Sequence, residues 1–236
     1  MIGIIGALPR EVDGLKKAME NVKVTKVSSI EFCSGTLCGV DVVVAEAGMG
    51  KVNAAVTAQT MILKYKPEFI VNIGVAGGLI KSLGVGDIVI ADRTAEHDMD
   101  ATALGDELGY ITGLNRVYMD CDRELVELLR ECTKKMGINT IVGTIVSGDQ
   151  FIDSDDQRKR LTEVFNGVAA EMEGAAIGHV CAMNDVPFGV LRAISDGADS
   201  DSHMDYWTFC NMAANNSIKI IKGLLTRMGQ KDSCRG

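Results

Sequence analysis

Four carboxylates and one arginine stand where predicted strands end. Glu11 follows the first predicted strand, Glu171 and Glu173 follow a later one, and Asp196 ends the last. Arg192 lies four residues before Asp196, so the two share a face of that strand. Because ligands of open α/β sheets bind beyond the carboxyl ends of the strands, these side chains are candidates for acid–base chemistry on one ligand.

A carboxylate at the end of a strand has a simpler interpretation as well. A lone Asp or Glu at such a place is often a helix N-cap or a solvent-facing group. Glu171 and Glu173, however, lie within the apolar run at residues 168–177. Ionisable groups buried in such surroundings are paired, neutralised or functional, which favours a site.

Two glycine-rich segments are candidates for binding a nucleotide phosphate. Residues 48–53 lack the third glycine of a dinucleotide fingerprint, and Lys51 is not followed by the Ser or Thr of a P-loop. Residues 74–78 are predicted to form a turn that lets the backbone approach a ligand closely. Neither segment supports NAD or ATP, and we expect no cofactor.

Composition excludes several classes of partner. The formal net charge is −8 with acidic residues spread along the chain, which disfavours nucleic acid and anionic membranes as partners and favours a small molecule. The apolar start of the chain is too short for a signal sequence and no run approaches a membrane span, so we expect a cytoplasmic protein. Seven cysteines without a CxxC pair and three scattered histidines predict no metal site.

Alternating strand and helix patterns predict an α/β fold. Eight strands are expected at residues 1–5, 30–37, 40–45, 69–73, 87–91, 140–146, 167–170 and 187–194. Helices are expected at 51–65, 122–136, 156–165, 174–184 and 207–228, and in an early segment with Val12, Leu15, Ala18 and Val22 on one face. Doubly buried strands predict three α/β/α layers around a central mixed, largely parallel sheet. Without linkers or repeats, residues 1–236 are expected to form a single domain.

Several segments of the chain match one known family. They are Ile4–Ala7 with Glu11–Val12, Gly48–Val52, Asn72–Leu79, Val85–Val89, His97–Asp98, Ile145–Asp149 with Phe151–Ile152, Glu171–Glu173 and Arg192–Asp196. In this order they resemble the 5′-methylthioadenosine/S-adenosylhomocysteine nucleosidases, which have the nucleoside phosphorylase fold. The resemblance covers residues 2 to about 228.

This resemblance implies a mechanism for breaking the N-glycosidic bond of an adenine nucleoside. Asp196 would protonate N7 of the leaving adenine, and Glu173 would bind the ribose hydroxyls beside the developing positive charge. Glu11 would orient or deprotonate the attacking water, with Arg192 nearby. The division of roles parallels the two-carboxylate logic of glycosidases.

The resemblance also implies contacts with the substrate. Phe151 would stack on adenine, the Ile152 backbone would bind the edge of the base, and Met172 would pack under the ribose. Gly77, Glu171 and Ser195 are further expected contacts, while Leu8, Met49 and Tyr206 offer apolar surface to the 5′ group. Without the surrounding motif, Phe151 and Met172 would be interpreted as core residues.

Three alternatives for the activity remain open. A phosphorylase of the same fold would need arginines around phosphate, but the first loop carries Glu11, and no arginine follows the loop at residues 74–78 until Arg93. A non-catalytic nucleoside-binding protein is a second alternative. A third is a nucleosidase acting on 5′-deoxyadenosine or an aminodeoxyfutalosine-type substrate.

The chain departs from the family pattern in places. Val75 stands where the family has serine, Leu104–Leu108 replaces an aromatic-rich loop, and Thr112 replaces a common proline. Val75 removes or replaces a polar contact near the acid, whereas the loop lines the pocket for the 5′ group, so the 5′-group preference is less firmly implied than the reaction class. The family also implies a homodimer and a place in methionine salvage.

Overall fold

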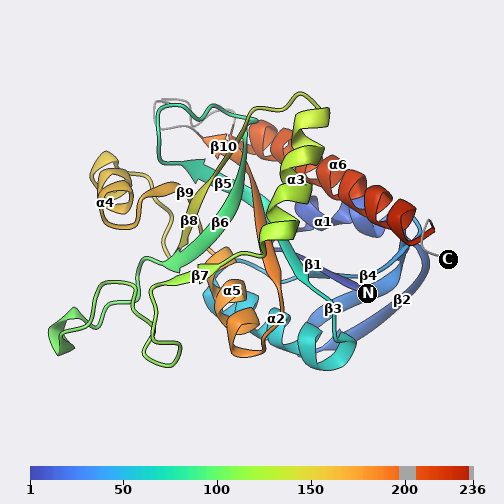
Figure 1. Ribbon diagram of the computed structural model, residues 1–236, viewed down its shortest axis with the longest axis horizontal. Coiled ribbons are helices and arrows are strands. Elements are labelled where there is room, and N and C mark those ends of the chain that lie inside the picture. Colours follow the sequence, from blue (N-terminus) through green and yellow to red (C-terminus); the bar gives the residue numbers. More distant parts are fainter. Residues whose placement is uncertain (197–205, 234–236) are drawn as a thin grey trace.

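The computed structural model describes residues 1–196 and 206–233, with side chains at positions 1–195 and 214–230 (Figure 1). The strands are β1 (Ile2–Gly6), β2 (Glu20–Val27), β3 (Ile30–Leu37), β4 (Val40–Glu46), β5 (Ile70–Gly78), β6 (Ile88–Glu96), β7 (Tyr118–Asp120), β8 (Thr140–Ser147), β9 (Gly167–Glu171) and β10 (Phe188–Asp196). The helices are α1 (Pro9–Lys16), α2 (Lys51–Tyr65), α3 (Arg123–Lys135), α4 (Asp155–Phe165), α5 (Gly174–Met183) and α6 (Tyr206–Ser233), with a 3-10 turn at Thr102–Leu104.

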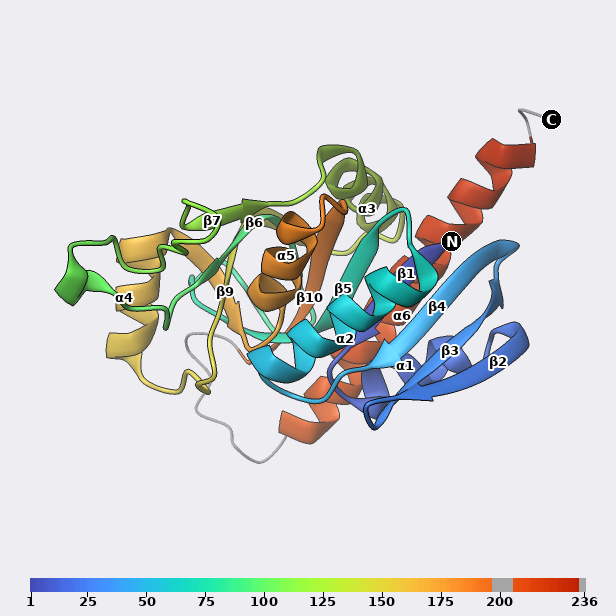
Figure 2. The ribbon, with the colours of Figure 1, turned by 90° about the horizontal axis from the view of Figure 1, so that it is seen from below.

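One mixed sheet contains these strands, in the order β10-β6-β8-β9-β5-β1-β4-β3-β2, with β7 paired to β6. β10 also pairs in parallel with β5, so β5, β10, β6, β8 and β9 form a closed ring. Helices α1, α3 and α6 cover one side of the sheet and α2 and α5 the other (Figure 2). The predicted α/β class with a central mixed sheet between helical layers is therefore confirmed.

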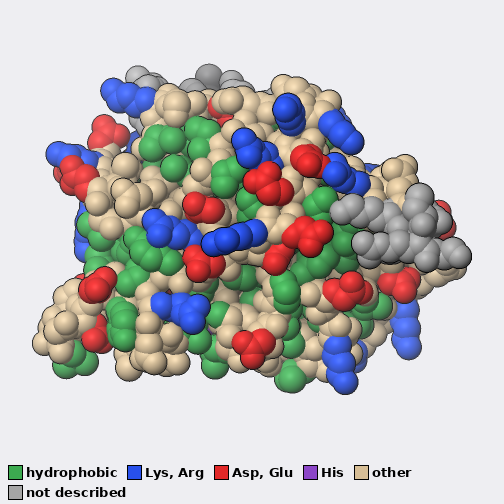
Figure 3. Space-filling view, viewed as in Figure 1, with side chains coloured by type: hydrophobic (Ala, Val, Ile, Leu, Met, Phe, Trp, Pro, Cys, Tyr) green, Lys and Arg blue, Asp and Glu red, His purple; other side chains and the backbone are tan. Residues whose placement is uncertain are grey.

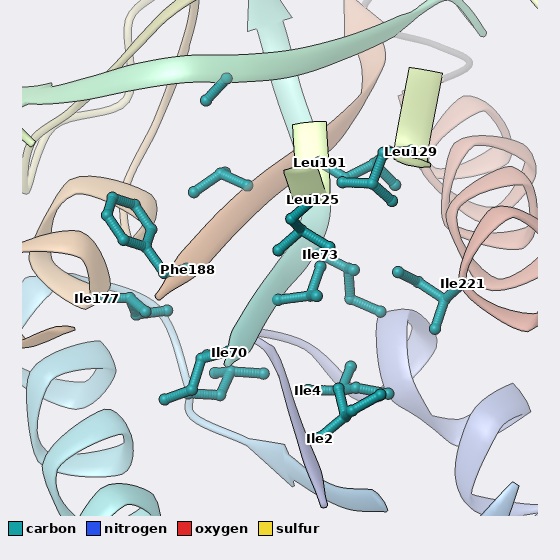
Figure 4. Close-up of a cluster of buried hydrophobic side chains, with 14 of the residues drawn as sticks. Ile2, Ile4, Ile70, Ile73, Leu125, Leu129, Ile177, Phe188, Leu191 and Ile221 are labelled. Carbon is teal, nitrogen blue, oxygen red and sulfur yellow. The ribbon is translucent and has the colours of Figure 1, made fainter. Parts of the chain in front are cut away.

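Apolar side chains fill the space between the sheet and its helices. Every residue of β1 is buried, as the continuous apolar run predicts for a central strand. Leu125 and Leu129 of α3 lie near Leu191 of β10, and Ile221 of α6 belongs to the same buried cluster (Figure 4). This packing fixes the strand ends that carry the site.

Capping residues and Pro67 explain why helices α2, α3 and α4 begin or end near the predicted positions. Asp122 caps α3, its carboxylate accepting a hydrogen bond from the Leu125 amide at 2.8 Å. Ser154 caps α4 in the same way through the Gln157 amide at 3.3 Å. Helix α2 ends at Tyr65, and Lys66 adopts a left-handed conformation before Pro67. Caps of this kind satisfy backbone groups that the helix leaves without partners.

The first predicted helix is wrong beyond Lys16. Val22, expected on its buried face, lies instead in edge strand β2 and is 44% exposed. Only Glu11, Val12 and Leu15 of α1 are buried, and Asn21 has a positive φ of 53° that helix geometry excludes. Pairing with β3 therefore prevails over the helical spacing of apolar residues.

The turn predicted at residues 74–78 is also wrong, because this segment continues β5. It pairs with β10 through Gly74–Gly77 and with β9 through Gly77 and Gly78. Residues 74–78 have few side chains that could pack, but hydrogen bonds along both edges stabilise them as a strand. β6 likewise runs on to Glu96, beyond the Ala91 end that the sequence predicts.

The surface combines charged, polar and apolar side chains. On the face shown in Figure 3, acidic and basic side chains are interspersed among apolar ones. The segment between β6 and β7, residues 97–117, projects from the body in both ribbon views (Figures 1 and 2). Within residues 1–196 and 206–233, no helix combines the length and the apolar character that crossing a membrane requires.

The core predicts the effect of truncating Leu129, which is fully buried between α3 and the sheet. Leu129→Ala should lower the free energy of unfolding by about 2–5 kcal/mol, because it leaves a cavity as well as losing apolar contact. Glu127→Ala, at an exposed position on the same helix, should change it by less than about 0.5 kcal/mol. Urea unfolding of both variants measures the difference, and equal effects would contradict this description of the core.

Candidate active site

A cleft opens at the carboxyl ends of β1, β5, β9 and β10. Its walls come from the β1–α1 connection, the β4–α2 loop, the last residues of β5, the β8–α4 loop, the turn after β9, and α4. Ten of the thirteen predicted site residues line it: Leu8, Glu11, Met49, Gly77, Phe151, Ile152, Glu171, Met172, Glu173 and Ser195. A concave site that combines apolar side chains with a few convergent carboxylates suits a small organic ligand.

The other three predicted residues lie differently. Arg192 is buried behind the cleft wall, with 1% of its surface exposed. Asp196 is the last residue of β10, where its backbone pairs with Gly77 of β5, and its side chain lies outside the described residues. Tyr206 begins α6, and its side chain lies outside them too.

Glu11 is held rigidly at the floor of the cleft. Its Oε2 accepts hydrogen bonds from the amides of Ala7 at 2.7 Å and Leu8 at 2.9 Å, and its Oε1 accepts one from Val75 at 3.2 Å. Gly74 makes this approach possible, because a Cβ at that position would lie 2.8 Å from Oε1. Burial raises the pKa of Glu11, while the charge of Arg192 and the three amides oppose this rise. An oriented carboxylate with a raised pKa is suited to proton transfer.

Arg192 and Glu171 form a buried ion pair beneath the cleft. The Arg192 Nε donates to Glu171 Oε2 at 3.1 Å, and its Nη2 contacts both Glu171 and Asn72. The Glu171 carboxylate also accepts hydrogen bonds from the amides of Glu173 and Gly174 and from the Ser147 hydroxyl. With so many partners within the protein, this carboxylate is suited to fixing the turn after β9.

Glu173, in the same turn, has fewer protein partners than Glu171. Its Oε1 accepts the Gly50 amide at 2.9 Å, and its Oε2 lies 3.9 Å from Arg192 Nη2. Burial and the neighbouring charge of Glu171 raise the pKa of Glu173 to about 7, although Arg192 and the Gly50 amide act against them. Its charge therefore changes near neutral pH, a common property of functional groups in clefts.

The opposite side of the cleft offers flat and apolar surface. Phe151 is 61% exposed and lines the cleft together with Ile152, so an aromatic face is accessible to a ligand. Gly77 pairs with Ala170 of β9 and contributes backbone to the wall. The Ser195 hydroxyl donates to the Ala76 carbonyl at 3.4 Å.

Some residues of the site were not predicted from the sequence. Asn72 and Ser147 anchor the ion pair, and Asn72 carries a signal, since it is the polar residue of an otherwise apolar strand. Arg158 of α4 also lines the cleft, but its helical segment carries no signal for a site. Among the residues that the structure describes, no group of three or more His, Cys, Asp and Glu side chains is placed to hold a metal ion.

Comparisons with known proteins agree with this geometry. The phosphorylase superfamily model matches residues 1–226. The 5′-methylthioadenosine/S-adenosylhomocysteine nucleosidase of Staphylococcus aureus (strain JH9) is 39% identical over 229 residues, which are 97% of this chain and all of that protein.

Solved structures show the same relationship. The nucleosidase of that name from Neisseria meningitidis, in complex with methylthio-immucillin-A, superposes with a TM-score of 0.91 and 36% identity, covering 96% of this chain and 98% of that one. Futalosine hydrolase of Helicobacter pylori has a TM-score of 0.90 and 32% identity, covering 96% and 97%. Sequence, fold and cleft together place the chain in the 5′-methylthioadenosine/S-adenosylhomocysteine nucleosidase family of the phosphorylase superfamily.

Proposed function

We propose that this protein hydrolyses the N-glycosidic bond of 5′-methylthioadenosine and S-adenosylhomocysteine, releasing adenine and the 5-substituted ribose. The observation that carries the proposal is Glu11, a buried carboxylate fixed by three backbone amides in a cleft that also offers apolar and aromatic surface. The family of the chain supports the same reaction.

The charges of the reaction suggest a role for each acid. Cleavage leaves electrons on the adenine and positive charge on the ribose, so an acid at N7 and a carboxylate beside the ribose both lower the barrier. We assign the first role to Asp196 at the end of β10 and the second to Glu173. Glu11 would bind the attacking water and accept its proton, and Arg192 would hold the turn that carries Glu173.

The charges of this cleft suit a neutral water molecule as the nucleophile better than a phosphate dianion. A phosphate dianion needs charge-assisted donors, but Glu11 and Glu173 present carboxylates to the cleft. The arginines near it already have protein partners, because Arg192 binds Glu171 and Asn72 while Arg158 pairs with Asp155 at 3.1 Å. The charge pattern therefore favours hydrolysis over phosphorolysis.

The remaining contacts follow the shape of the cleft. Phe151 would stack on the adenine ring, with the Ile152 and Gly77 backbones and Ser195 along its edge. Met172 would pack under the ribose. Leu8 and Met49 line the part of the cleft that we assign to the 5′ group, together with Tyr206 at the start of α6. Because apolar contacts discriminate weakly between 5′ groups, 5′-deoxyadenosine and aminodeoxyfutalosine are further candidate substrates.

An exposed apolar face suggests that the protein is a homodimer. Val52, Val56 and Leu63 share one face of α2 and are 73%, 41% and 68% exposed, and Met183 of the adjacent α5 is 65% exposed. Contiguous apolar surface of this kind marks an interaction site. A second copy of the chain is the occupant we propose, with the projecting segment at residues 97–117 reaching over its partner.

Three broader proposals accompany this function. Residues 1–236 form a single domain, as the span of one family model and one sheet supports. The enzyme works in the cytoplasm on a small adenine nucleoside. Its reaction belongs to methionine salvage, because it removes adenine from nucleosides that carry methionine-derived sulfur.

The direct test is adenine release from 5′-methylthioadenosine by the purified protein, in phosphate-free buffer and again with added phosphate. We expect equal release in both, with free methylthioribose as the second product, because water attacks. Release only with phosphate would make the protein a phosphorylase. Tight nucleoside binding without release would make it a binding protein.

The role of Glu11 predicts that Glu11→Gln loses most turnover. Removing the proton acceptor should lower kcat by about 10²–10⁴-fold, as expected for general base catalysis. Asp13→Asn on the same helix should keep near wild-type kcat, and thermal unfolding of both variants shows whether they are folded. A folded Glu11→Gln enzyme with normal turnover, or with a new phosphate-dependent reaction, would overturn this role.

The proposed dimer predicts that Val56→Asp shifts the protein toward monomer, since the substitution places an unpaired carboxylate in an apolar interface. The matched control is Val24→Asp on edge strand β2, where Val24 is 57% exposed and outside the α2–α5 face. Analytical ultracentrifugation measures the mass of each. A monomeric wild-type protein, or a dimer that Val56→Asp leaves intact, would contradict the proposal.

A further inference from the structure

A cluster of charged side chains lies beside the cleft and takes no part in the mechanism above. Lys51 is the first residue of α2, and its Nζ lies 2.8 Å from Glu96 Oε2 and 2.7 Å from Asp98 Oδ1. The other oxygen of Glu96 contacts His179 Nδ1 at 2.8 Å. One ammonium group is thus bound between two carboxylates from the end of β6 and the residues after it.

The backbone around this cluster connects two walls of the cleft. The Lys51 amide donates to Asp149 Oδ1 at 2.8 Å, and the Asp149 amide donates to Asp98 Oδ2 at 2.9 Å. Asp98 therefore binds both the Lys51 ammonium and the start of the loop that carries Phe151. Segments about a hundred residues apart in the sequence are joined through one carboxylate.

The same segment reaches the carboxylate assigned to the ribose. Gly50, next to Lys51, donates its amide to Glu173 Oε1 at 2.9 Å. Gly50 has a φ of 95°, and a Cβ there would lie 2.9 Å from Asp149 Oδ1, so this close contact requires glycine. The position of the Gly50 amide thus depends on how firmly Lys51, the residue that follows it, is held by Asp149 through its amide and by Glu96 and Asp98 through its ammonium group.

The charges of the cluster stabilise one another. Burial opposes the charge on Lys51, yet hydrogen bonds with Asp98 and Glu96 raise the pKa of Lys51. Burial likewise acts against the charge of Glu96, but hydrogen bonds from His179 and Lys51 lower the pKa of its carboxylate. Burial also acts against the charge of Asp98, but hydrogen bonds from Lys51 and the Asp149 amide lower the pKa of that carboxylate. The ion pairs therefore persist at neutral pH and hold a fixed geometry.

We propose that Lys51 is a positioning residue for the nucleosidase reaction: its ammonium, bound by Glu96 and Asp98, fixes the Gly50 amide against Glu173 and so fixes the carboxylate that faces the ribose. The inference rests on the proposed function. Lys51 touches no substrate in this role and acts through Gly50. A displacement of about 1 Å at a reacting centre can cost about 10²-fold in rate, which makes such a contact important.

Lys51→Met removes the ammonium and keeps most of the apolar stem. We expect kcat for 5′-methylthioadenosine to fall by about 10–100-fold with a smaller change in KM, because a misplaced Glu173 stabilises the transition state less than a fixed one. Lys51→Arg retains the charge and should recover part of the loss. Lys64→Met, at an exposed position in the last turn of the same helix, is the matched control and should behave as wild type.

The pH profile separates positioning from a general loss of structure. Among the side chains that the structure describes, Glu171, Arg192 and Glu11 are the charged groups that act on Glu173, and the Gly50 amide lowers its pKa. Since the ionised form of Glu173 is needed, kcat/KM of the wild-type enzyme should rise as the pH increases through about 7. In Lys51→Met this rise should move to higher pH, because the amide that favours the charged form is no longer held in place.

Hydrogen exchange of the Gly50 amide, followed by NMR, tests the contact without turnover. Exchange should be faster in Lys51→Met than in wild type and Lys64→Met. A folded Lys51→Met enzyme with unchanged exchange and an unshifted pH profile would overturn the proposal, whatever its kcat. If the wild-type protein releases no adenine, the proposed function fails, and the exchange rate of Gly50 still supports or overturns the positioning contact.

Discussion

Removing a guanidinium group from water has a large desolvation cost, and the partners of buried Arg192 offset this cost. The same partners hold together the strand ends around the cleft. Glu171 supplies the opposite charge and Asn72 a neutral acceptor, while Ser147 and the amides after β9 occupy the remaining positions on Glu171. These groups come from β5, β8, β9 and β10. The ion pair and its partners therefore connect four of the five strands in the ring.

The carboxylates of the cleft differ because their surroundings differ. Glu171 is neutralised by Arg192 and surrounded by donors, whereas Glu11 has backbone amides and Glu173 has a single amide and a more distant guanidinium. The number of protein donors around each carboxylate therefore determines how much of it is left to bind a ligand. The same residue type thus has different surroundings at each of the three positions: an ion pair for Glu171, backbone amides for Glu11, and a single amide for Glu173.

Much of the fold was predictable from local pattern. The ends of α2, α3 and α4 follow from caps and from Pro67, and the doubly buried strands follow from continuous apolar runs. Prediction failed at β2, where Val22 continues the helical spacing of Val12, Leu15 and Ala18 although the segment pairs with β3. It failed also at the glycines that end β5, which form a strand because both edges are hydrogen bonded. Hydrogen bonds between distant strands have no local sequence signal.

For the site, the sequence by itself determined which residue types were available and that they follow strand ends, since strand periodicity and the family motifs fix both. Ten of the residues that it singled out line the cleft. Only the tertiary structure decided that Arg192 lies behind the wall, that Glu171 is bound by protein groups, and that Lys51 joins two walls through Asp98. These assignments depend on distances between segments far apart in the chain, and such distances are set by packing and by the closure of the sheet.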